Sequence, residues 1–312
     1  MTSLRMRLFG AAIRPGMQRM FRAAADPKPL RDKLEHSARY VFRAPPFVLG
    51  LEDRYLGAAG EMPARWTSCR PNDHTHILLY FHGGGYIAGS PQTHSAMIAQ
   101  LAKRTGLRAF APAYRLAPEH PLPAAFEDAC AAHASLIARG YAPQNIVIGG
   151  DSAGGGIALA LLAHLCATGQ QPAAAFAWSP FTDQTFSGAS VQENAATDHF
   201  FPAERVHDLA AMILGDLPAN DPRASPLYAR FPDCPPVLIQ ASSSEILRDD
   251  AMRMDAHLRA QGAHSRLEMW DGAPHVWQMF YSFFPEAREA IENTAQFLKN
   301  VLKHSPSEPA EN

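Results

Sequence analysis

Short apolar runs recur along the chain from about residue 47 and alternate with segments whose apolar residues follow a helical spacing. Two early segments, 49–56 and 61–70, alternate apolar and polar residues, which predicts antiparallel strands at one edge of a sheet. Other runs are apolar throughout, as expected of strands that a parallel sheet buries on both faces. These runs are residues 77–81, 146–148 and 237–239. The alternation of strands with helices predicts an α/β fold around a mostly parallel sheet.

Three helices can be placed from apolar spacing and from the residues that end them. The segment 124–139 has helical spacing and stops at Gly140, a residue type that commonly follows a helix C-terminus. Residues 157–163 are apolar on every side, which indicates a helix buried in the core, and Gly169 ends it. The final segment, 285–302, has one apolar stripe and is therefore expected to pack on the sheet.

The first 25 residues differ from the rest of the chain, since they contain five arginines and no acidic residue. Their apolar residues follow a nearly helical spacing, which predicts an amphipathic helix that covers the main domain. A mitochondrial transit peptide has a similar composition. Pro15 and Gly16 interrupt the helical pattern and argue against that alternative, so we favour the covering helix.

A second segment breaks the alternation, because residues 182–228 separate two predicted strands by far more than a connection between them requires. Within it, Pro202 opens a helical pattern that could fold over the end of the sheet. We therefore expect N-terminal cap helices over 1–46 and one large domain over 47–304, with 182–228 as an insertion. The polar tail, 305–312, is expected to be disordered.

Composition and charge exclude several classes of protein. The chain has 312 residues, a formal net charge of −2 and no long basic run, so a nucleic-acid partner is not expected. No stretch approaches the roughly 18 consecutive apolar residues of a membrane-spanning helix, so we expect no stable membrane insertion and a cytoplasmic protein. The expected ligand is then a small neutral molecule.

The cysteines and histidines do not form a metal-binding pattern. The cysteines have no C-x-x-C or C-x-x-H spacing, so we expect unpaired thiols in a reducing compartment. His74 and His76 lie two residues apart, but no third candidate ligand is near them in the sequence, so no metal is expected. The cysteines are Cys69, Cys130, Cys166 and Cys234.

Ser152 is the candidate nucleophile. The predicted strand 146–148 runs directly into residues 149–156, with the sequence GGDSAGGG, and then into the buried helix. A sharp turn between a strand and a helix needs glycines and lifts one side chain clear of the sheet, as in the G-x-S-x-G nucleophile elbow. A glycine-rich turn with an incidental serine would also match the motif. Here, however, the strand, the turn and the helix are all present.

A serine hydroxyl needs an adjacent base, and the base needs an acid that fixes its tautomer. In folds with this elbow, both partners follow the serine and lie after later strands. His275 follows the predicted strand 265–269 and is the expected base. Two other histidines, His257 and His264, lie on or just after a predicted helix and are expected to be solvated.

The acid is expected just after the strand that ends near residue 240, where Glu245, Asp249 and Asp250 compete. Glu245 is nearest to the end of the strand. The two aspartates fall in the first turn of the next helix, where carboxylates also stabilise the helix N-terminus. We therefore favour Glu245 and keep the aspartates as alternatives.

Acyl transfer also needs hydrogen-bond donors that face the developing oxyanion. After the run 77–81 comes His82-Gly83-Gly84-Gly85, an HGGG motif typical of the oxyanion holes of lipases and esterases. Glycine suits this position because a Cβ atom would obstruct the approaching carbonyl group. A flexible turn is the alternative interpretation of three glycines. We assign the donors to the backbone N–H groups of Gly83, Gly84 and Ala153.

Together these motifs resemble those of the bacterial hormone-sensitive-lipase-like esterases. The matching segments are HGGG at 82–85, GDSAGG at 150–155 and YRLAPEHP at 114–121. The resemblance covers most of the chain and implies the α/β-hydrolase fold with an eight-stranded sheet and no cofactor. It also implies a helical cap, built from the N-terminus and an insertion after the sixth strand. A homodimer is compatible with the resemblance, although no segment indicates an interface.

The chain departs from the commoner family pattern at the acid. Where many relatives have aspartate in a D-P-L-R-D segment, this chain has Glu245 in the segment EILRD. Some family members look like this one in having glutamate. Asp249 aligns with the family's second aspartate, which the resemblance makes structural.

The predicted function is hydrolysis of short-chain carboxylic esters by Ser152, His275 and Glu245. A deacetylase or amidase of the same fold is an alternative, because the sequence does not distinguish the bond that is cleaved. A non-catalytic ligand receptor is a third alternative. Plant gibberellin receptors resemble this family but have lost the catalytic histidine, which this chain keeps. Residues of the predicted cap that could line an acyl pocket, or simply pack, are Met17, Met20, Phe21, Phe200, Phe201 and Met212.

Overall fold

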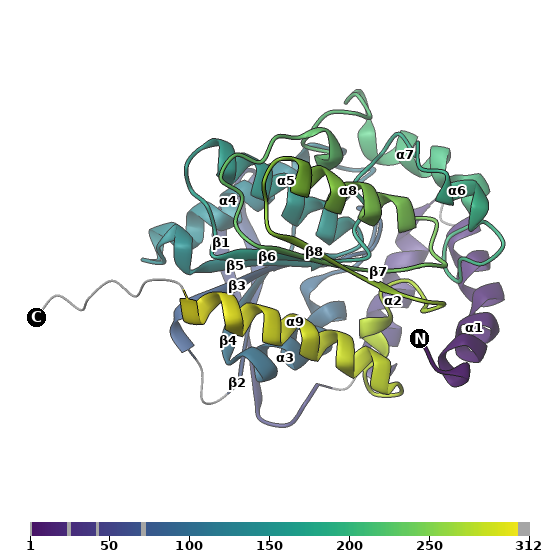
Figure 1. Ribbon diagram of the computed structural model, residues 1–312, viewed down its shortest axis with the longest axis horizontal. Coiled ribbons are helices and arrows are strands. Elements are labelled where there is room, and N and C mark those ends of the chain that lie inside the picture. The colour runs from purple at the N-terminus through teal and green to yellow at the C-terminus, as the bar shows by residue number, and fades with distance from the viewer. Residues whose placement is uncertain (1, 24–25, 42–43, 70–72, 305–312) are drawn as a thin grey trace, which may run out of the picture.

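The computed structural model of the protein describes residues 2–23, 26–41, 44–69 and 73–304 (Figure 1). Eight strands form one sheet in the order β1-β2-β4-β3-β5-β6-β7-β8. Strand β2 runs antiparallel to both of its neighbours, and the other neighbouring pairs are parallel. The predicted disordered tail, 305–312, lies outside the described residues. The strands are β1 Val48–Gly57, β2 Gly60–Cys69, β3 Asp73–Phe81, β4 Leu107–Pro112, β5 Ile146–Asp151, β6 Ala174–Trp178, β7 Val237–Ser242 and β8 Ser265–Trp270.

The burial of the strands follows their sequence patterns. Every residue of β5, β6 and β7 is buried, and so are the last five residues of β3, as expected of strands covered on both faces. Strands β1 and β2 pair as an antiparallel hairpin and alternate more in their burial. The apolar runs and the two alternating segments therefore predicted both the central strands and the edge of the sheet correctly.

Helices cover the sheet in two layers (Figure 1). One face carries α4, α5 and α8, and the other carries α3 and α9. The apolar core is accordingly divided into one cluster on each side of the sheet. Helix α5 is buried along nearly its whole length, as its uninterrupted apolar sequence predicted. These helices are α3 Pro91–Thr105, α4 Ala124–Ala138, α5 Ala153–Ala167, α8 Arg248–Ala260 and α9 Pro285–His304.

Four further helices gather at one end of the molecule, on the right of Figure 1, and we call them the cap. They come from the two segments that break the sequence pattern. They are α1 Leu4–Arg22, α2 Pro27–Val41, α6 Ser190–Glu193 and α7 Val206–Leu214. Short 3₁₀ turns lie at η1 Pro143–Asn145, η2 Ala203–Arg205, η3 Pro226–Tyr228 and η4 Trp277–Phe280. Among the helices of the described chain, none has the length and apolar character that crossing a bilayer requires.

Helix α1 continues through Pro15, so our expectation that Pro15 and Gly16 interrupt the helix was wrong. A proline inside a helix removes one backbone donor. Packing compensates here, because side chains on both sides of the proline bind the insertion. Arg14 Nε and Gln18 Nε2 both donate to the backbone carbonyl of Asp198, at 3.0 and 3.2 Å. Tertiary contacts of this kind, rather than local propensity, hold most helices in proteins.

Candidate active site

Ser152 occupies a sharp turn between β5 and α5. Its backbone has φ 53° and ψ −121°, a combination that non-glycine residues rarely adopt. The Ser152 N–H donates to Trp178 O at 2.8 Å, and the Ser152 carbonyl accepts from the Phe181 N–H at 3.0 Å. A Cβ atom on Gly154 would lie 2.1 Å from the Phe81 carbonyl oxygen, so this position requires glycine. The turn therefore fixes the serine at the carboxyl end of the central strands.

The structure brings the expected base to this serine. His275 follows β8, and its Nε2 lies 2.9 Å from Ser152 Oγ. On the other side of the ring, His275 Nδ1 lies 2.5 Å from Glu245 Oε2. All three side chains are buried, with 4%, 4% and 1% of the surface of Ser152, His275 and Glu245 exposed. The arrangement is a continuous chain of hydrogen-bonding groups from carboxylate to hydroxyl.

The second carboxylate oxygen of Glu245 is held by two donors. Glu245 Oε1 accepts from the Ser179 hydroxyl and from the Ser242 backbone N–H, both at 2.8 Å. The Ser179 hydroxyl oxygen also accepts from the Val276 N–H at 3.3 Å, next to the base. Ser179 thus links the acid to the loop that carries His275. Sequence analysis missed it, because a lone serine after β6 belongs to no motif.

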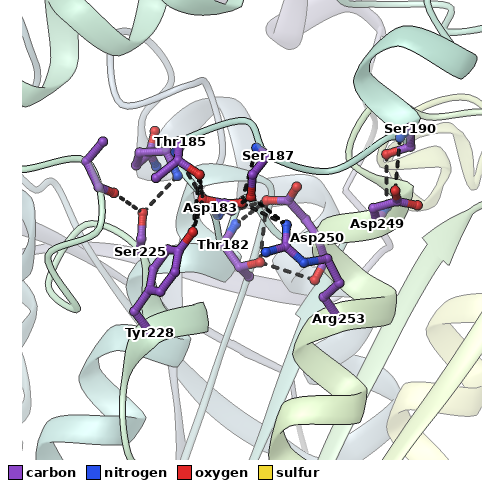
Figure 2. Close-up of polar contacts among 12 residues, drawn as sticks. Thr182, Asp183, Thr185, Ser187, Ser190, Ser225, Tyr228, Asp249, Asp250 and Arg253 are labelled. Atoms are coloured by element: carbon purple, nitrogen blue, oxygen red, sulfur yellow. Dashed lines mark hydrogen bonds and ion pairs between the residues drawn. The ribbon is translucent and has the colours of Figure 1, made fainter.

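Asp249 and Asp250, the alternative acids, bind the insertion instead (Figure 2). Asp249 Oδ2 accepts from the Ser190 backbone N–H at 2.9 Å. Asp250 Oδ2 accepts from the backbone N–H groups of Thr182 and Asp183 at 2.7 and 2.9 Å. Both aspartates lie in the first turn of α8, as predicted. They fasten the start of the insertion to that helix.

The electrostatic environment suits His275 to the role of base. Burial by itself would lower the pKa of the imidazole. The adjacent Glu245 carboxylate outweighs burial, and the pKa of His275 lies above its ordinary value of 6.5. A carboxylate that stabilises the imidazolium in this way favours proton transfer from the serine.

Gly83 does not serve as the sequence analysis expected. Its N–H donates to Asp151 Oδ1 at 3.1 Å, and both residues lie inside the protein. This N–H is therefore already bonded, and our assignment of it as an oxyanion donor was wrong. Gly84 and Gly85, the next two glycines, line a cavity together with Ser152, whereas Gly83 does not. Within the described structure, their N–H groups and that of Ala153 have no hydrogen-bond acceptor. The N–H groups of this loop and of the elbow that remain available are thus those of Gly84, Gly85 and Ala153.

Asp151 is the centre of a buried polar cluster behind these glycines. Besides the Gly83 N–H, its Oδ1 accepts from the Tyr80 hydroxyl at 2.7 Å. His94 Nε2 lies 3.3 Å from Asp151 Oδ2. Burial opposes ionisation of Asp151, yet His94 and Tyr80 hold the pKa of the carboxyl below its usual value. Burial lowers the pKa of the His94 imidazole. The Asp151 carboxylate raises it, and the pKa lies above its ordinary value. The two buried side chains therefore stabilise each other's charged forms.

Two cavities meet at Ser152. The first, which we call the small cavity, has a volume of about 60 Å³ and lies toward α7. The second, the large cavity, has a volume of about 480 Å³ and lies between α1, α2 and His275. All the cap residues that the sequence singled out line one cavity or both. In the small cavity they are Phe21, Phe201 and Met212, and in the large cavity they are Met17, Met20, Phe21, Phe200 and Phe201.

The other histidines considered from the sequence lie elsewhere. His257 Nε2 lies 2.7 Å from the carbonyl oxygen of Ala229, and His264 is exposed. His76 Nδ1 lies 2.7 Å from Asp73 Oδ2. Across the part of the chain that the structure describes, no three or more His, Cys, Asp or Glu side chains are grouped so as to hold a metal ion.

Comparisons with known proteins indicate the family of the chain. The sequence model of a family described as alpha/beta hydrolase fold matches residues 78–279. An acetyl-hydrolase of Streptomyces hygroscopicus is 36% identical over 254 residues, which cover 81% of this chain and 85% of the relative. An esterase of Acinetobacter venetianus is 32% identical over 277 residues, covering 88% and 89%.

Solved structures extend the similarity to the whole fold. The crystal structure of an esterase from the bacterial hormone-sensitive lipase family superposes with a TM-score of 0.87 at 36% identity. That match covers 97% of this chain and all of the other chain. A hormone-sensitive lipase from a metagenome library gives a TM-score of 0.86 at 30% identity, covering 94% and 98%.

Proposed function

The chain belongs to the alpha/beta hydrolase family and, within it, to the bacterial hormone-sensitive lipase family, and on this basis we propose a carboxylic ester hydrolase acting through Ser152, His275 and Glu245. The observation that carries the proposal is the hydrogen-bonded sequence of these three side chains, with distances of 2.5 and 2.9 Å. A serine hydroxyl in such contact with a buried imidazole is activated for attack on an acyl group.

In the first step, the Ser152 Oγ attacks the ester carbonyl carbon while its proton passes to His275 Nε2. The His275 Nδ1–H donates to Glu245, which fixes the tautomer and stabilises the imidazolium that forms. Glu245 in turn stays oriented, because its other oxygen accepts from Ser179 and Ser242. Its longer side chain therefore takes the place of the aspartate in the commoner family pattern.

The carbonyl oxygen gains negative charge as the tetrahedral intermediate forms. We assign its stabilisation to the backbone N–H groups of Gly84, Gly85 and Ala153, which have no acceptor within the described structure. The intermediate collapses when His275 returns the proton to the leaving alcohol oxygen. Water then enters, gives a proton to His275 and attacks the acyl group on Ser152. The same groups act in reverse order and release the carboxylic acid and free enzyme.

The same contacts weigh against the alternative functions. A ligand receptor has no need of a base hydrogen-bonded to a serine, whereas His275 makes that bond here. Among the alternatives that keep the hydrolase, a deacetylase has support from the relative described as an acetyl-hydrolase. Cleavage of acetyl esters is part of the activity proposed here, so the two descriptions differ in substrate rather than in mechanism.

We place the enzyme in the cytoplasm. All four cysteines are free, which supports a reducing compartment.

The test compares the Ser152→Ala and Ser282→Ala variants in hydrolysis of p-nitrophenyl acetate. Ser282 is exposed and is not one of the three proposed catalytic residues, so its variant is the matched control. We expect Ser152→Ala to lose at least about 10³-fold in kcat/KM and the control to keep the rate of the wild type. A phosphonate ester that reacts with nucleophilic serines should label the wild-type chain once, and not the Ser152→Ala chain. Full activity of Ser152→Ala would refute the proposal.

A further inference from the structure

The two cavities at Ser152 differ in their relation to the base. Ser152 and Gly85 line both cavities, so each cavity opens onto the attacking oxygen and one oxyanion donor. His275 lines the large cavity and is not among the residues of the small one. The two sides of the serine are therefore chemically different.

This difference assigns the two halves of a bound ester. When the tetrahedral intermediate collapses, His275 gives its proton to the oxygen of the leaving alcohol. The leaving oxygen must then lie within hydrogen-bond reach of His275 Nε2, on the side of the large cavity. The acyl chain extends in the other direction from the carbonyl carbon, into the small cavity.

Two aromatic rings lie where the cavities meet. Phe201 packs edge-on against the His275 ring, with centroids 4.6 Å apart. Phe21 lies against Phe201 at 5.0 Å. Both phenylalanines line both cavities, as Ser152 and Gly85 do, so the rings lie beside the junction that a bound ester has to span.

The volumes set different limits on the two halves of the ester. The small cavity, at about 60 Å³, is the smaller of the two. Leu209, Met212 and Phe186 are among the side chains that line it. The large cavity measures about 480 Å³, eight times the volume of the small one.

The walls of the large cavity are mainly apolar. Several of them are flexible methionines, namely Met17, Met20 and Met279. Methionine adapts its shape to irregular apolar groups. The lining therefore favours a bulky apolar group of variable shape.

We infer that the substrates of this enzyme are esters of a short acyl group with a large apolar alcohol, and that the alcohol occupies the cavity between α1, α2 and His275. This inference rests on the proposed function and specifies its substrate class. The size limit falls on the acid that is formed, and the alcohol that is released is the larger product.

A pair of isomeric esters tests the assignment. Octyl acetate and ethyl octanoate have the same formula and leaving groups of similar acidity, but the long chain is in the alcohol of one and the acid of the other. Hydrolysis is followed by titration of the released acid at constant pH. We expect kcat/KM to be roughly tenfold or more higher for octyl acetate. Equal values, or a preference for ethyl octanoate, would overturn the inference while leaving the esterase activity intact.

Variants in each cavity sharpen the test. Met17→Trp fills part of the large cavity and should lower kcat/KM for octyl acetate severalfold relative to ethyl acetate. Leu209→Ala widens the small cavity and should raise kcat/KM for ethyl octanoate relative to octyl acetate. Met252→Trp and Leu56→Ala are matched controls on exposed side chains. The opposite pattern, with each variant acting on the other ester, would show that the two cavities have exchanged roles.

The two proposals fail in different ways. If p-nitrophenyl acetate hydrolysis does not depend on Ser152, the proposed function is wrong. If that hydrolysis depends on Ser152 but the isomers are not distinguished as expected, only the substrate assignment is wrong.

Discussion

The backbone N–H of Gly83 donates to the Asp151 carboxylate over 3.1 Å, which joins the loop after β3 to the residue immediately before the nucleophile. The two residues are 68 positions apart in the chain. With Gly83 fixed in this way, the next glycines along the loop face the cavity beside Ser152. Asp151 is therefore placed to position the proposed oxyanion donors through Gly83.

Replacing Asp151 should separate this positioning role from general stability. Asp151→Ala removes the acceptor for Gly83, so we expect kcat to fall roughly 10²-fold with a smaller change in KM. Asp151→Asn keeps an acceptor oxygen for Gly83 and Tyr80. It should therefore keep most of the activity that Asp151→Ala loses. Steady-state kinetics with p-nitrophenyl acetate measure both constants, and the Tm of each variant shows whether it folds. Equal losses in the two variants would contradict the role assigned to Gly83.

Replacing the carboxylates near His275 distinguishes the triad acid from its neighbours. Glu245→Gln should lower kcat by up to about 10⁴-fold, because the amide no longer stabilises the imidazolium. Asp249→Asn keeps an oxygen for the Ser190 N–H and should cost far less. The measurement is kcat for p-nitrophenyl acetate in both variants at one pH. A larger loss in Asp249→Asn would move the acid to that residue.

The activity should fall at acidic pH, because His275 becomes protonated there. The protonated imidazole cannot accept the proton of Ser152, so kcat/KM should rise with pH as His275 loses its proton. Because Glu245 raises the pKa of His275, the midpoint of this limb should lie above 6.5. A pH profile of kcat/KM between pH 5 and 9 measures it. A midpoint below 6.5 would contradict the direction of the shift.

The stability of the protein should depend on Asp250. Burial is the main cause that raises the pKa of this carboxyl from 3.8 to about 7, and the nearby Asp183 carboxylate adds to it. The native state then holds a proton that the unfolded chain releases near pH 4, so stability decreases as the pH rises from about 4 to 7. The loss amounts to about 4 kcal/mol at most.

Asp250→Asn should remove this pH dependence, because the amide carries no charge and can still accept from the Thr182 and Asp183 N–H groups. The measurement is the free energy of unfolding in urea at pH 5 and pH 8 for both proteins. We expect the difference between the two pH values to shrink in the variant. The Arg253 guanidinium, which donates to Asp183 at 2.8 Å, stays charged throughout this range (Figure 2). Identical pH dependences in wild type and variant would rule out Asp250 as the titrating group.

The sequence predicted the strands and helices of the main domain because their apolar patterns depend on local geometry. Central strands such as β5 and β7 are apolar throughout since both faces are covered, and α5 is apolar on every side since the core surrounds it. The positions of Ser152 and His275 also followed from order along the chain, because each comes directly after a recognisable strand.

Contacts between distant segments could not be predicted in this way. Which N–H groups of the HGGG loop are available depends on the Asp151 carboxylate, and no pattern within the loop shows that Gly83 is bonded to it. Helix α1 continues through Pro15 because Arg14 and Gln18 bind the insertion some 180 residues away. His94, whose Nε2 lies 3.3 Å from Asp151 Oδ2, is on a helix where its sequence context gives no indication of a role.

The nucleophile and the cavity walls belong to different parts of the molecule. Ser152 lies at the start of α5, a helix that is buried along nearly its whole length. Met17 and Leu209 lie on cap helices and line the cavities beside the serine. Substitutions at Met17 and Leu209 are therefore expected to change which esters are accepted while leaving the contacts among Ser152, His275 and Glu245 in place. These two cap positions are suitable targets for directed evolution toward new esters.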